Sequence, residues 1–400
     1  ISTKRISMNR PVIVSFARTP IAKFRGSLSS LRAPELGAIA VRGAIARIGM
    51  ENDVNITEAF MGNVVSAGIG QAPCRQAIIG AGLPKSTICT TINKVCASGM
   101  KSVMLASQMI QCGGLQKSTD ALVAGGFESM SNIPHYLMSS RSGTALGHSQ
   151  LTDGVIHDGL WDIYNNQHMG MCAEKCAKDY DISREEQDAY AIESYTRAQN
   201  AVSSGIFSSE IECVNVPQRR GDAIVIDTDE EPFSVKLDKL PSLRPAFTGD
   251  HGTVTAANSS SLNDGAAAMV LMSEDSASEL GLKPLARILG YGDAAQDPVD
   301  FTTSPSLAIP IAARNAGIDV SDIAYHEINE AFSVVALANM KLMNLDAQKV
   351  NVFGGAVALG HPIGMSGARI IGNLYNVLKH SDASIGCASI CNGGGGASAI

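Results

Sequence analysis

The chain has 400 residues, of which 45% are hydrophobic and 17% are charged, and 39 are glycines. This composition is typical of a globular protein of two to three domains with a large core, and it excludes a disordered chain. The net charge of −7, without a long basic stripe, argues against nucleic acid as a partner, and no apolar stretch reaches the roughly 20 residues of a membrane span.

The N-terminal part of the chain alternates apolar runs with helical patterns. Residues 1–10 are basic and contain no acidic residue, which fits either the remnant of a transit peptide or a tail before the first strand. The runs Pro11–Phe16 and Ala121–Gly125 are apolar without alternation, which predicts strands buried on both faces. Residues 36–48 and 101–110 have the pattern of helices.

The C-terminal part of the chain repeats this order. Residues 307–316 and 368–378 have helical patterns, and 385–390 form another short apolar run. Cys96 precedes the pair Gly99-Met100 at the same spacing at which His361 precedes Gly364-Met365. The segments Ile56–Phe60 and Ile328–Phe332 also match, and each follows a helical stretch. These matches indicate an internal repeat.

We therefore predict two α/β halves, residues 1–127 and 262–400, separated by residues 128–261. The separating region carries the only tryptophan and the densest clusters of charge, so we expect an inserted domain that covers one face. The repeat would place Cys96 and His361 on equivalent strand-to-helix turns, facing each other across a pseudo-twofold axis. Ligands of such sheets bind beyond the carboxyl ends of the strands.

Cys96 and His361 are the first candidates for catalysis. A thiol at the start of a helix lies near the positive end of the helix dipole and near free backbone N–H groups, which favour the thiolate. The turn from Gly360 to Gly364 fixes the direction of the His361 ring. Taken singly, a structural cysteine and a core histidine are the alternatives. At matched repeat positions, a nucleophile and its base are the better interpretation.

Cys391 and Asn329 follow apolar runs in the second half. Cys391 begins the segment Cys391–Gly396, which contains four consecutive glycines and no following helix pattern. A backbone N–H nest beside a second thiol fits this segment better than a phosphate-binding loop, because the Lys-Ser/Thr ending of such loops is absent. Asn329 is either a donor to a developing oxyanion or a helix N-cap, and the spacing is compatible with both.

The other cysteines give no metal-binding pattern. Cys172 and Cys176 lie four residues apart, but no second pair or neighbouring histidine completes a zinc spacing. We expect free thiols in a reducing compartment.

Four motifs in this order resemble the thiolase family. They are Val95–Met100, Asn329–Phe332, Gly360–Ala368 and Cys391–Gly396, and the likeness extends over nearly the whole chain through 125–131, 168–170 and 252–258. The resemblance implies duplicated α/β halves in a layered αβαβα arrangement with an inserted loop domain. It also implies a reversible Claisen condensation of two acetyl-CoA molecules to acetoacetyl-CoA and CoA, without a tightly bound cofactor.

The resemblance also implies roles for individual residues. Cys96 would carry the acyl group, His361 would accept the thiol proton, and Cys391 would move the proton of the α-carbon. One oxyanion pocket would consist of His361 and a water held by Asn329, and the other of the backbone N–H groups of Cys96 and Gly393. Further residues would contact the CoA substrate: His168, Met169, Tyr195, Ser234, Val235, Lys236, Lys239, Ser260 and Phe332.

The chain is similar in particular to mitochondrial, short-chain members of the family. These bind potassium and chloride, and the positions matching the potassium ligands are Tyr195, Ala256, Ala257, Ser259 and Val357. The resemblance further implies a homotetramer, built as a dimer of dimers, in the mitochondrial matrix, with the cytoplasm as the alternative. Thr302, after Phe301, stands where that type often has proline, at a place associated with 2-methyl-branched acyl groups.

Other functions fit the residues less well. A 3-ketoacyl-CoA thiolase of broader chain length is the main alternative. A ketoacyl synthase usually pairs its nucleophile with two histidines, and a non-catalytic acyl-CoA carrier typically lacks one of the reactive residues. In a papain-like hydrolase the second thiol, Cys391, would have no function.

Overall fold

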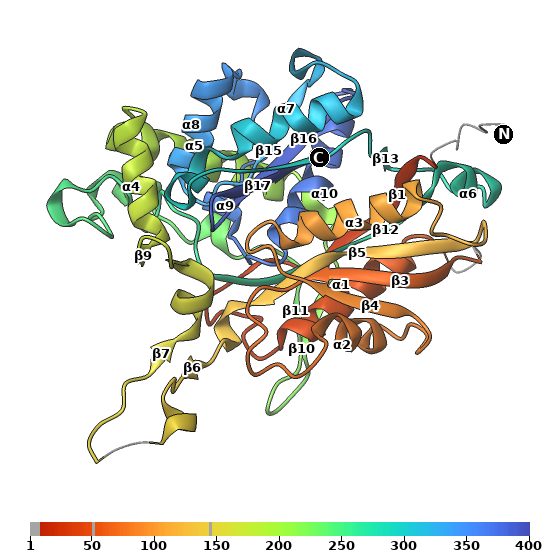
Figure 1. Cartoon of the computed structure of the whole chain (residues 1–400), viewed down its shortest axis with the longest axis horizontal. Helices are drawn as coiled ribbons and strands as arrows, with labels where there is room; N and C mark the ends of the chain where they lie inside the picture. The colour runs from red at the N-terminus through yellow and green to blue at the C-terminus, as the bar shows by residue number, and fades with distance from the viewer. Residues whose placement is uncertain (1–8, 50–52, 144–145) are drawn as a thin grey trace.

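The computed structural model describes residues 9–49, 53–143 and 146–400 (Figure 1). The basic segment expected to be a tail or a transit-peptide remnant lies, up to residue 8, outside the described residues. Among the described residues, no helix combines the length and the apolar character that crossing a membrane requires. All nine cysteines are free thiols, as expected.

The N-terminal half is built on a mixed sheet whose central strands are buried on both faces. Along β1, Val12 and Val14 pack into one core cluster and Ile13 into another, as expected for a strand between two layers. A register shift between Ile13 and Ser15 then exchanges the faces, so Phe16 packs with Ile13. The strand order is β13 (Ala286–Arg287), β1 (Pro11–Arg18), β12 (Asn263–Ser273), β5 (Asp120–Ser129), β3 (Asn55–Gly62) and β4 (Ile88–Ile92), with β2 (Ala22–Lys23) paired to β12.

The C-terminal half repeats the same sheet pattern with fewer strands. Its order is β14 (Gly292–Ala295), β17 (Gly396–Ala399), β16 (Gly386–Asn392) and β15 (Tyr325–Ile328). The parallel pair β3–β5 ends with Gly62 opposite Gly126, and the parallel pair β15–β16 ends with Ile328 opposite Ser389. An antiparallel strand follows in each sheet, β12 beside β5 and β17 beside β16. The predicted duplication is therefore present in the strand pairing.

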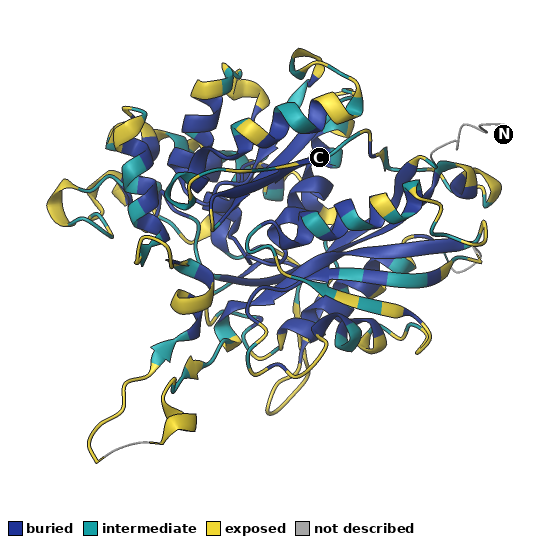
Figure 2. Ribbon diagram, viewed as in Figure 1, coloured by how far each residue is buried: buried dark blue, intermediate teal, exposed yellow. Residues whose placement is uncertain are grey.

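Helices complete the predicted αβαβα layers (Figure 1). One outer layer packs on the N-terminal sheet, a central helical pair lies between the two sheets, and a third layer covers the C-terminal sheet. The central pair buries most of its residues, 9 of 14 in α3 and 11 of 15 in α10, whereas exposed residues are frequent on the outer helices and loops (Figure 2). The layers are α1 (Ala33–Ala46) and α2 (Pro73–Gly80), then α3 (Ser98–Gln111) and α10 (Ser366–His380), then α7 (Pro305–Ala316) and α8 (Ser333–Met343), with α6 (Glu274–Glu279) and α9 (Ala356–Leu359) as short connecting helices.

The region between the halves contacts both of them. Its two longer helices, α4 (Met169–Asp179) and α5 (Arg184–Ser203), pack against α8 and α9 of the C-terminal half. The hairpin β10 (Val214–Val216) and β11 (Ile224–Ile226) reaches the outer core of the N-terminal half. Residues 135–143 and 146–153 project away from the body of the molecule (Figure 1), and their bases pair as β6 (His135–Tyr136) and β7 (Thr152–Asp153). The chain then returns through the pair β8 (Trp161–Asp162) and β9 (Gln167–His168).

Two details of the expected repeat differ from the structure. The segment Ile56–Phe60 lies inside strand β3, but Ile328–Phe332 begins at the last residue of β15 and continues into the following loop. The two segments are therefore similar in sequence but do not occupy equivalent places in the structure. The residue equivalent to Asn329 is Asn63. The strand β12, which begins at Asn263, pairs between β1 and β5, so the boundary expected at 261/262 does not separate the two sheets. The place of β12 is decided by pairing between strands that are far apart in the sequence, and local sequence patterns do not report such pairing.

Glycines allow the two halves to approach closely around the central helices. A methyl group on Gly99 would lie 2.9 Å from the Gly364 carbonyl oxygen and 2.9 Å from the Ala368 nitrogen. A methyl group on Gly62 would lie 2.7 Å from the Gly99 nitrogen. A methyl group on Gly126 would collide with the Gly364 carbonyl oxygen. The starts of α3 and α10 therefore meet backbone against backbone.

Replacement of Gly126 by alanine should separate the halves at this contact. We expect a loss of about 1–3 kcal/mol in the free energy of unfolding, because the added methyl group meets backbone that cannot rotate away. Urea denaturation measures this loss. Gly80→Ala is the control, since Gly80 is exposed at the end of α2 and should stay within about 0.5 kcal/mol of the original protein. Equal stability of Gly126→Ala and the original protein would contradict the contact.

Candidate active site

Cys96 lies in a tight turn between β4 and α3. Val95 before it has a left-handed backbone with φ of 48°, and the Ser98 hydroxyl closes the turn by donating to the Val95 carbonyl oxygen at 2.6 Å. Burial raises the pKa of the Cys96 thiol to about 11, while the backbone N–H groups of Gly393 and Cys96 act in the opposite direction. The backbone N–H groups therefore favour the thiolate, as expected, but burial outweighs them and the thiol stays protonated.

His361 is fixed by three polar contacts in the turn before α10. Its backbone N–H donates to Asn263 Oδ1 at 2.8 Å, and its Nδ1 lies 2.6 Å from the Ser366 hydroxyl. That hydroxyl donates its single proton to the Pro362 carbonyl oxygen at 3.0 Å, so it accepts from His361 Nδ1–H. The Nε2 atom then carries an electron pair, which Asn329 Nδ2 faces at 3.4 Å as the third contact. Burial, followed by the charge of Arg369, lowers the pKa of His361 to about 3. The neutral ring is a proton acceptor.

Asn329 follows the last residue of β15 and points at the imidazole ring. Its Nδ2 lies 3.4 Å from His361 Nε2, and its backbone N–H donates to the Ser389 carbonyl oxygen at 2.9 Å. Its Oδ1 is buried and has no hydrogen-bond partner among the described residues. The residue at the N-cap of the next helix, α8, is Phe332, so the alternative of Asn329 as an N-cap is wrong.

Cys391 lies near the end of β16, with its thiol fully buried. Burial raises the pKa of Cys391 well above its usual range, and the neighbouring Cys96 raises it further. The backbone then turns through Gly394 and Gly395, whose φ values of 86° and 85° are left-handed and favour glycine. The next element is a strand, β17, in agreement with the expectation that no helix follows. Cys391 and Gly393 therefore approach Cys96 from the opposite half.

The five expected catalytic residues thus form two adjoining groups. Cys96, Cys391 and the Gly393 N–H are neighbours, and His361 and Asn329 are neighbours. Cys96 and Ile363, in the turn that follows His361, pack into one apolar cluster, which joins the two groups. The arrangement provides two thiols, a neutral imidazole, two backbone donors and a side-chain amide. Such a set can transfer an acyl group and move a proton at carbon.

The residues expected to contact CoA fall into three places. The sulfur atom of Met169, at the start of α4, lies 3.5 Å from the position that a methyl group on Gly393 would take. His168 stacks on Phe247 with ring centroids 4.7 Å apart. Ser260 donates from its N–H and its hydroxyl to the Ala331 carbonyl oxygen at 3.0 and 2.9 Å, next to Phe332. The third place is the stretch with Ser234, Val235, Lys236 and Lys239.

In that stretch, Lys236 and Lys239 are exposed and form no ion pair within the described part of the chain. Ser234 is tied locally through its hydroxyl to Glu231, at 2.8 Å, and Val235 packs against the inner core. The two cations face solvent on the side of the inserted region.

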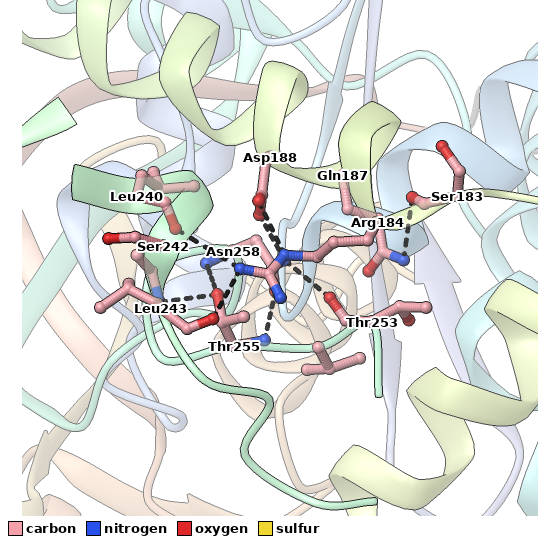
Figure 3. Close-up of polar contacts among 12 residues, drawn as sticks. Ser183, Arg184, Gln187, Asp188, Leu240, Ser242, Leu243, Thr253, Thr255 and Asn258 are labelled. Carbon is pink, nitrogen blue, oxygen red and sulfur yellow. Dashed lines mark hydrogen bonds and ion pairs between the residues drawn. The ribbon is translucent and has the colours of Figure 1, made fainter. Parts of the chain in front are cut away.

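The residues expected to hold potassium come from three elements. Ala256, Ala257 and Ser259 lie in the loop before β12, Tyr195 lies on α5 and Val357 on α9, and α5 packs against α9. Figure 3 shows how the loop is held: Asn258 donates to Asp188 Oδ1 at 2.9 Å and to the Thr253 carbonyl oxygen at 2.9 Å, and Arg184 pairs with Asp188 at 2.7 Å. No cluster of three or more His, Cys, Asp or Glu side chains suited to a metal occurs among the described residues.

Sequence reasoning missed Ser366 as a partner of His361. Its only signal in the sequence is its place five residues after the histidine, in the first turn of α10. A serine there is equally compatible with a simple helix start. The three-dimensional contact is what assigns the imidazole tautomer.

Comparison with known proteins agrees with this geometry. Residues 11–275 match the family model of the thiolase N-terminal domain, and residues 282–400 match that of the thiolase C-terminal domain. The mitochondrial acetyl-CoA acetyltransferase of Bos taurus is 53% identical, over 98% of this chain and 91% of the relative. The cytosolic acetyl-CoA acetyltransferase of Gibberella zeae is 53% identical, over 97% of this chain and 96% of the relative. The crystal structure of the Acat5 thiolase from Ascaris suum in complex with coenzyme A is 47% identical, covers 98% of each chain and has a TM-score of 0.91. The resemblance seen in the sequence motifs is confirmed, and the chain belongs to the thiolase family.

Proposed function

We propose that the protein is an acetyl-CoA C-acetyltransferase, which condenses two acetyl-CoA molecules to acetoacetyl-CoA and CoA and catalyses the thiolytic cleavage in reverse. The observation that carries this proposal is the pair of thiols, Cys96 and Cys391, beside the Gly393 N–H and a neutral His361. Relatives with this activity in their names match the chain over nearly its full length, which supports the same conclusion.

The first half-reaction forms an acetyl thioester on Cys96. His361 Nε2 takes the proton of the Cys96 thiol, and the thiolate attacks the carbonyl carbon of acetyl-CoA. The backbone N–H groups of Cys96 and Gly393 donate to the oxyanion, and each such preorganised donor contributes ~3–4 kcal/mol. The bond to the CoA sulfur then breaks, and the proton held by His361 passes to the departing CoA thiolate.

The second half-reaction forms the carbon–carbon bond. Cys391 passes its thiol proton to His361 Nε2, and the resulting thiolate removes a proton from the α-carbon of a second acetyl-CoA. The enolate oxygen is stabilised by the Nε2–H of the protonated His361 and by a water bound at Asn329. The unpartnered Oδ1 of Asn329 supports this role, since it can accept a hydrogen bond from that water. The enolate carbon attacks the acetyl group, Cys96 leaves as a thiolate, and His361 returns the proton to it.

The surroundings of Cys391 support a short acyl group. Phe301, Phe332 and Met169 pack into the same apolar cluster as Cys391, and we infer that these large side chains narrow the space for the acyl group. Thr302 is also buried next to Phe301. These bulky neighbours favour acetoacetyl-CoA over the longer or 2-methyl-branched 3-ketoacyl-CoA substrates of the alternative function.

Acetylation of Cys96 tests the proposal directly. Incubation with acetyl-CoA should add one acetyl group to the tryptic peptide 95–101, in which Cys96 is the single cysteine. Cys96→Ser should reduce kcat for acetoacetyl-CoA cleavage by at least about 1,000-fold, because serine is not activated by this neutral base. Cys112→Ser is the matched control, because Cys112 is exposed at the far end of α3. A label that persists in Cys96→Ser would refute the mechanism.

Cys391→Ala should separate the two half-reactions. We expect the acetyl group to form on Cys96 as in the original protein, because Cys391 acts only at the α-carbon. Condensation should fall by about 100- to 10,000-fold, which is the usual contribution of a general base. Rapid-quench labelling and steady-state turnover measure the two steps. Equal loss of both steps would place Cys391 in acyl transfer instead.

A potassium ion fits the loop that carries Ala256, Ala257 and Ser259. The carbonyl oxygens of these three residues accept no hydrogen bond within the described part of the chain, and neutral oxygen ligands suit a hard cation. Tyr195 and Val357 would complete the site. When bound, the ion would supply charge that orders the loop next to Ser260, the proposed contact of the pantetheine arm.

Potassium should therefore stabilise the protein and raise its activity. We expect a higher Tm and a lower KM for acetyl-CoA in potassium chloride than in sodium chloride of the same concentration, because a ligand that binds only the folded state shifts unfolding. Tyr195→Phe should reduce the difference between the two salts. Identical Tm and KM in both salts would remove the potassium site from the proposal.

Assembly and location are two separate proposals. We propose a homotetramer on the family resemblance of the sequence motifs, and a mitochondrial location on the similarity to the mitochondrial protein of Bos taurus. The similarity to a cytosolic protein is equally high, and the cytoplasm remains the alternative. Gel filtration with light scattering and cell fractionation test the two statements.

A further inference from the structure

Glu128 is a buried carboxylate next to the active site that the mechanism above does not use. It lies near the carboxyl end of β5, with no exposed surface. In the duplicated halves it stands two residues after Gly126, just as Cys391 stands two residues after Ser389, and Gly126 and Ser389 occupy equivalent places in the strand pairing. The pseudo-twofold axis therefore relates Glu128 to the proposed base.

Four donors hold the Glu128 carboxylate from two different segments. Oε1 accepts from Asn63 Nδ2 at 3.0 Å and from the Val65 N–H at 3.2 Å. Oε2 accepts from the Val64 N–H at 2.9 Å and from the Gly364 N–H at 3.1 Å. Three donors come from the loop after β3, and the fourth comes from the turn that carries His361.

These two segments form the wall behind Cys96. Val64, Val65 and Ile363 make up the apolar cluster against which Cys96 packs. Glu128 therefore links both sides of that wall, one side from the N-terminal half and the other from the His361 turn. A shift of either side would change the distance between the nucleophile and its base.

The charge of Glu128 also acts on Cys96. Burial raises the pKa of Glu128 to about 8, and the backbone N–H groups of Val64, Val65 and Gly364 oppose burial. All four partners of the carboxylate are donors, and none of them can accept the proton of a carboxylic acid. The four donors favour the ionised form, which predominates above about pH 8, and there its charge disfavours the thiolate of Cys96.

We propose that Glu128 is a positioning residue of the condensation, which ties loop 63–65 to turn 361–364 and keeps Cys96 protonated until His361 receives its proton. This role rests on the proposed function, because it presumes that Cys96 is the acylated residue. This positioning role uses only the carboxylate of Glu128 and requires no metal or cofactor.

Two variants separate position from charge. Glu128→Gln keeps the shape of the side chain but removes the charge and brings an N–H₂ group against backbone donors. Glu128→Asp keeps the charge but is shorter by one methylene. Both should lower kcat by about 10- to 100-fold, because displacements of about 1 Å at reacting groups have effects of this size. The KM for acetyl-CoA should change by less than about twofold, since the CoA contacts lie elsewhere.

The pH profile of Cys96 alkylation by iodoacetamide is a measurement that a purely structural role of Glu128 would not change. The rate is followed on peptide 95–101, which excludes the other thiols. In Glu128→Gln the pH profile should shift to lower pH, because a negative charge beside the thiol has gone. In Glu128→Asp it should stay near that of the original protein. The other titratable or charged groups facing this region, Asp264, Cys391, His361 and Arg369, are the same in all variants.

Glu58→Gln is the control, since Glu58 is a partly buried carboxylate on β3 of the same sheet without a hydrogen bond of its side chain among the described residues. It should leave both kcat and the alkylation profile unchanged. Tm values show whether each variant is folded. An unchanged kcat in Glu128→Gln, or an unshifted alkylation profile, would overturn the proposal. Absence of acetyl-Cys96 in the original protein would instead overturn the proposed function.

Discussion

The close approach of α3 and α10 is the constraint on which the site depends. Both helices begin at the centre of the molecule, and their first turns touch through the backbone of Gly99 and Gly364. A side chain at Gly99 would press on the backbone of Gly364 and Ala368, and one at Gly364 would press on Glu128 and Phe127. Cys96 and His361 lie three residues before these glycines. The conformational freedom that glycine loses on folding destabilises the chain, and the buried sheets on either side offset this cost. Catalytic geometry thus follows from helix packing.

Burial sets the protonation of the resting site. It raises the pKa of Cys96 to about 11 and lowers that of His361 to about 3, so the nucleophile and the base are both neutral at pH 7. A neutral pair can exist in a low dielectric without a counterion, whereas a buried ion pair would carry a large desolvation cost. Charge then develops only as the acyl group arrives, at a position where the Gly393 N–H already points. The donors are ordered before the reaction and need no reorganisation.

The duplicated halves have diverged at equivalent positions. Cys96 corresponds to His361, Asn63 to Asn329, and Glu128 to Cys391. The first half supplies the nucleophile and holds it with a carboxylate, and the second supplies the base, the oxyanion donor and the second thiol. One half alone would carry three polar groups that could not catalyse the condensation. The pseudo-twofold axis brings the two complementary sets to one place.

The sequence by itself determined the family and the two α/β halves, and it predicted Cys96, His361, Cys391 and Asn329 as the site residues, because short motifs at strand ends and the matched spacing before two Gly-Met pairs are local properties of the chain. The bounds of α1, α3, α7 and α10 were also close to the helical patterns. Only the tertiary structure decided the place of β12, the true register of the repeat, the tautomer of His361 through Ser366 and the contacts of Glu128. Each of these depends on partners that are far away in sequence or on the burial of a charge, and neither quantity is encoded in a local pattern.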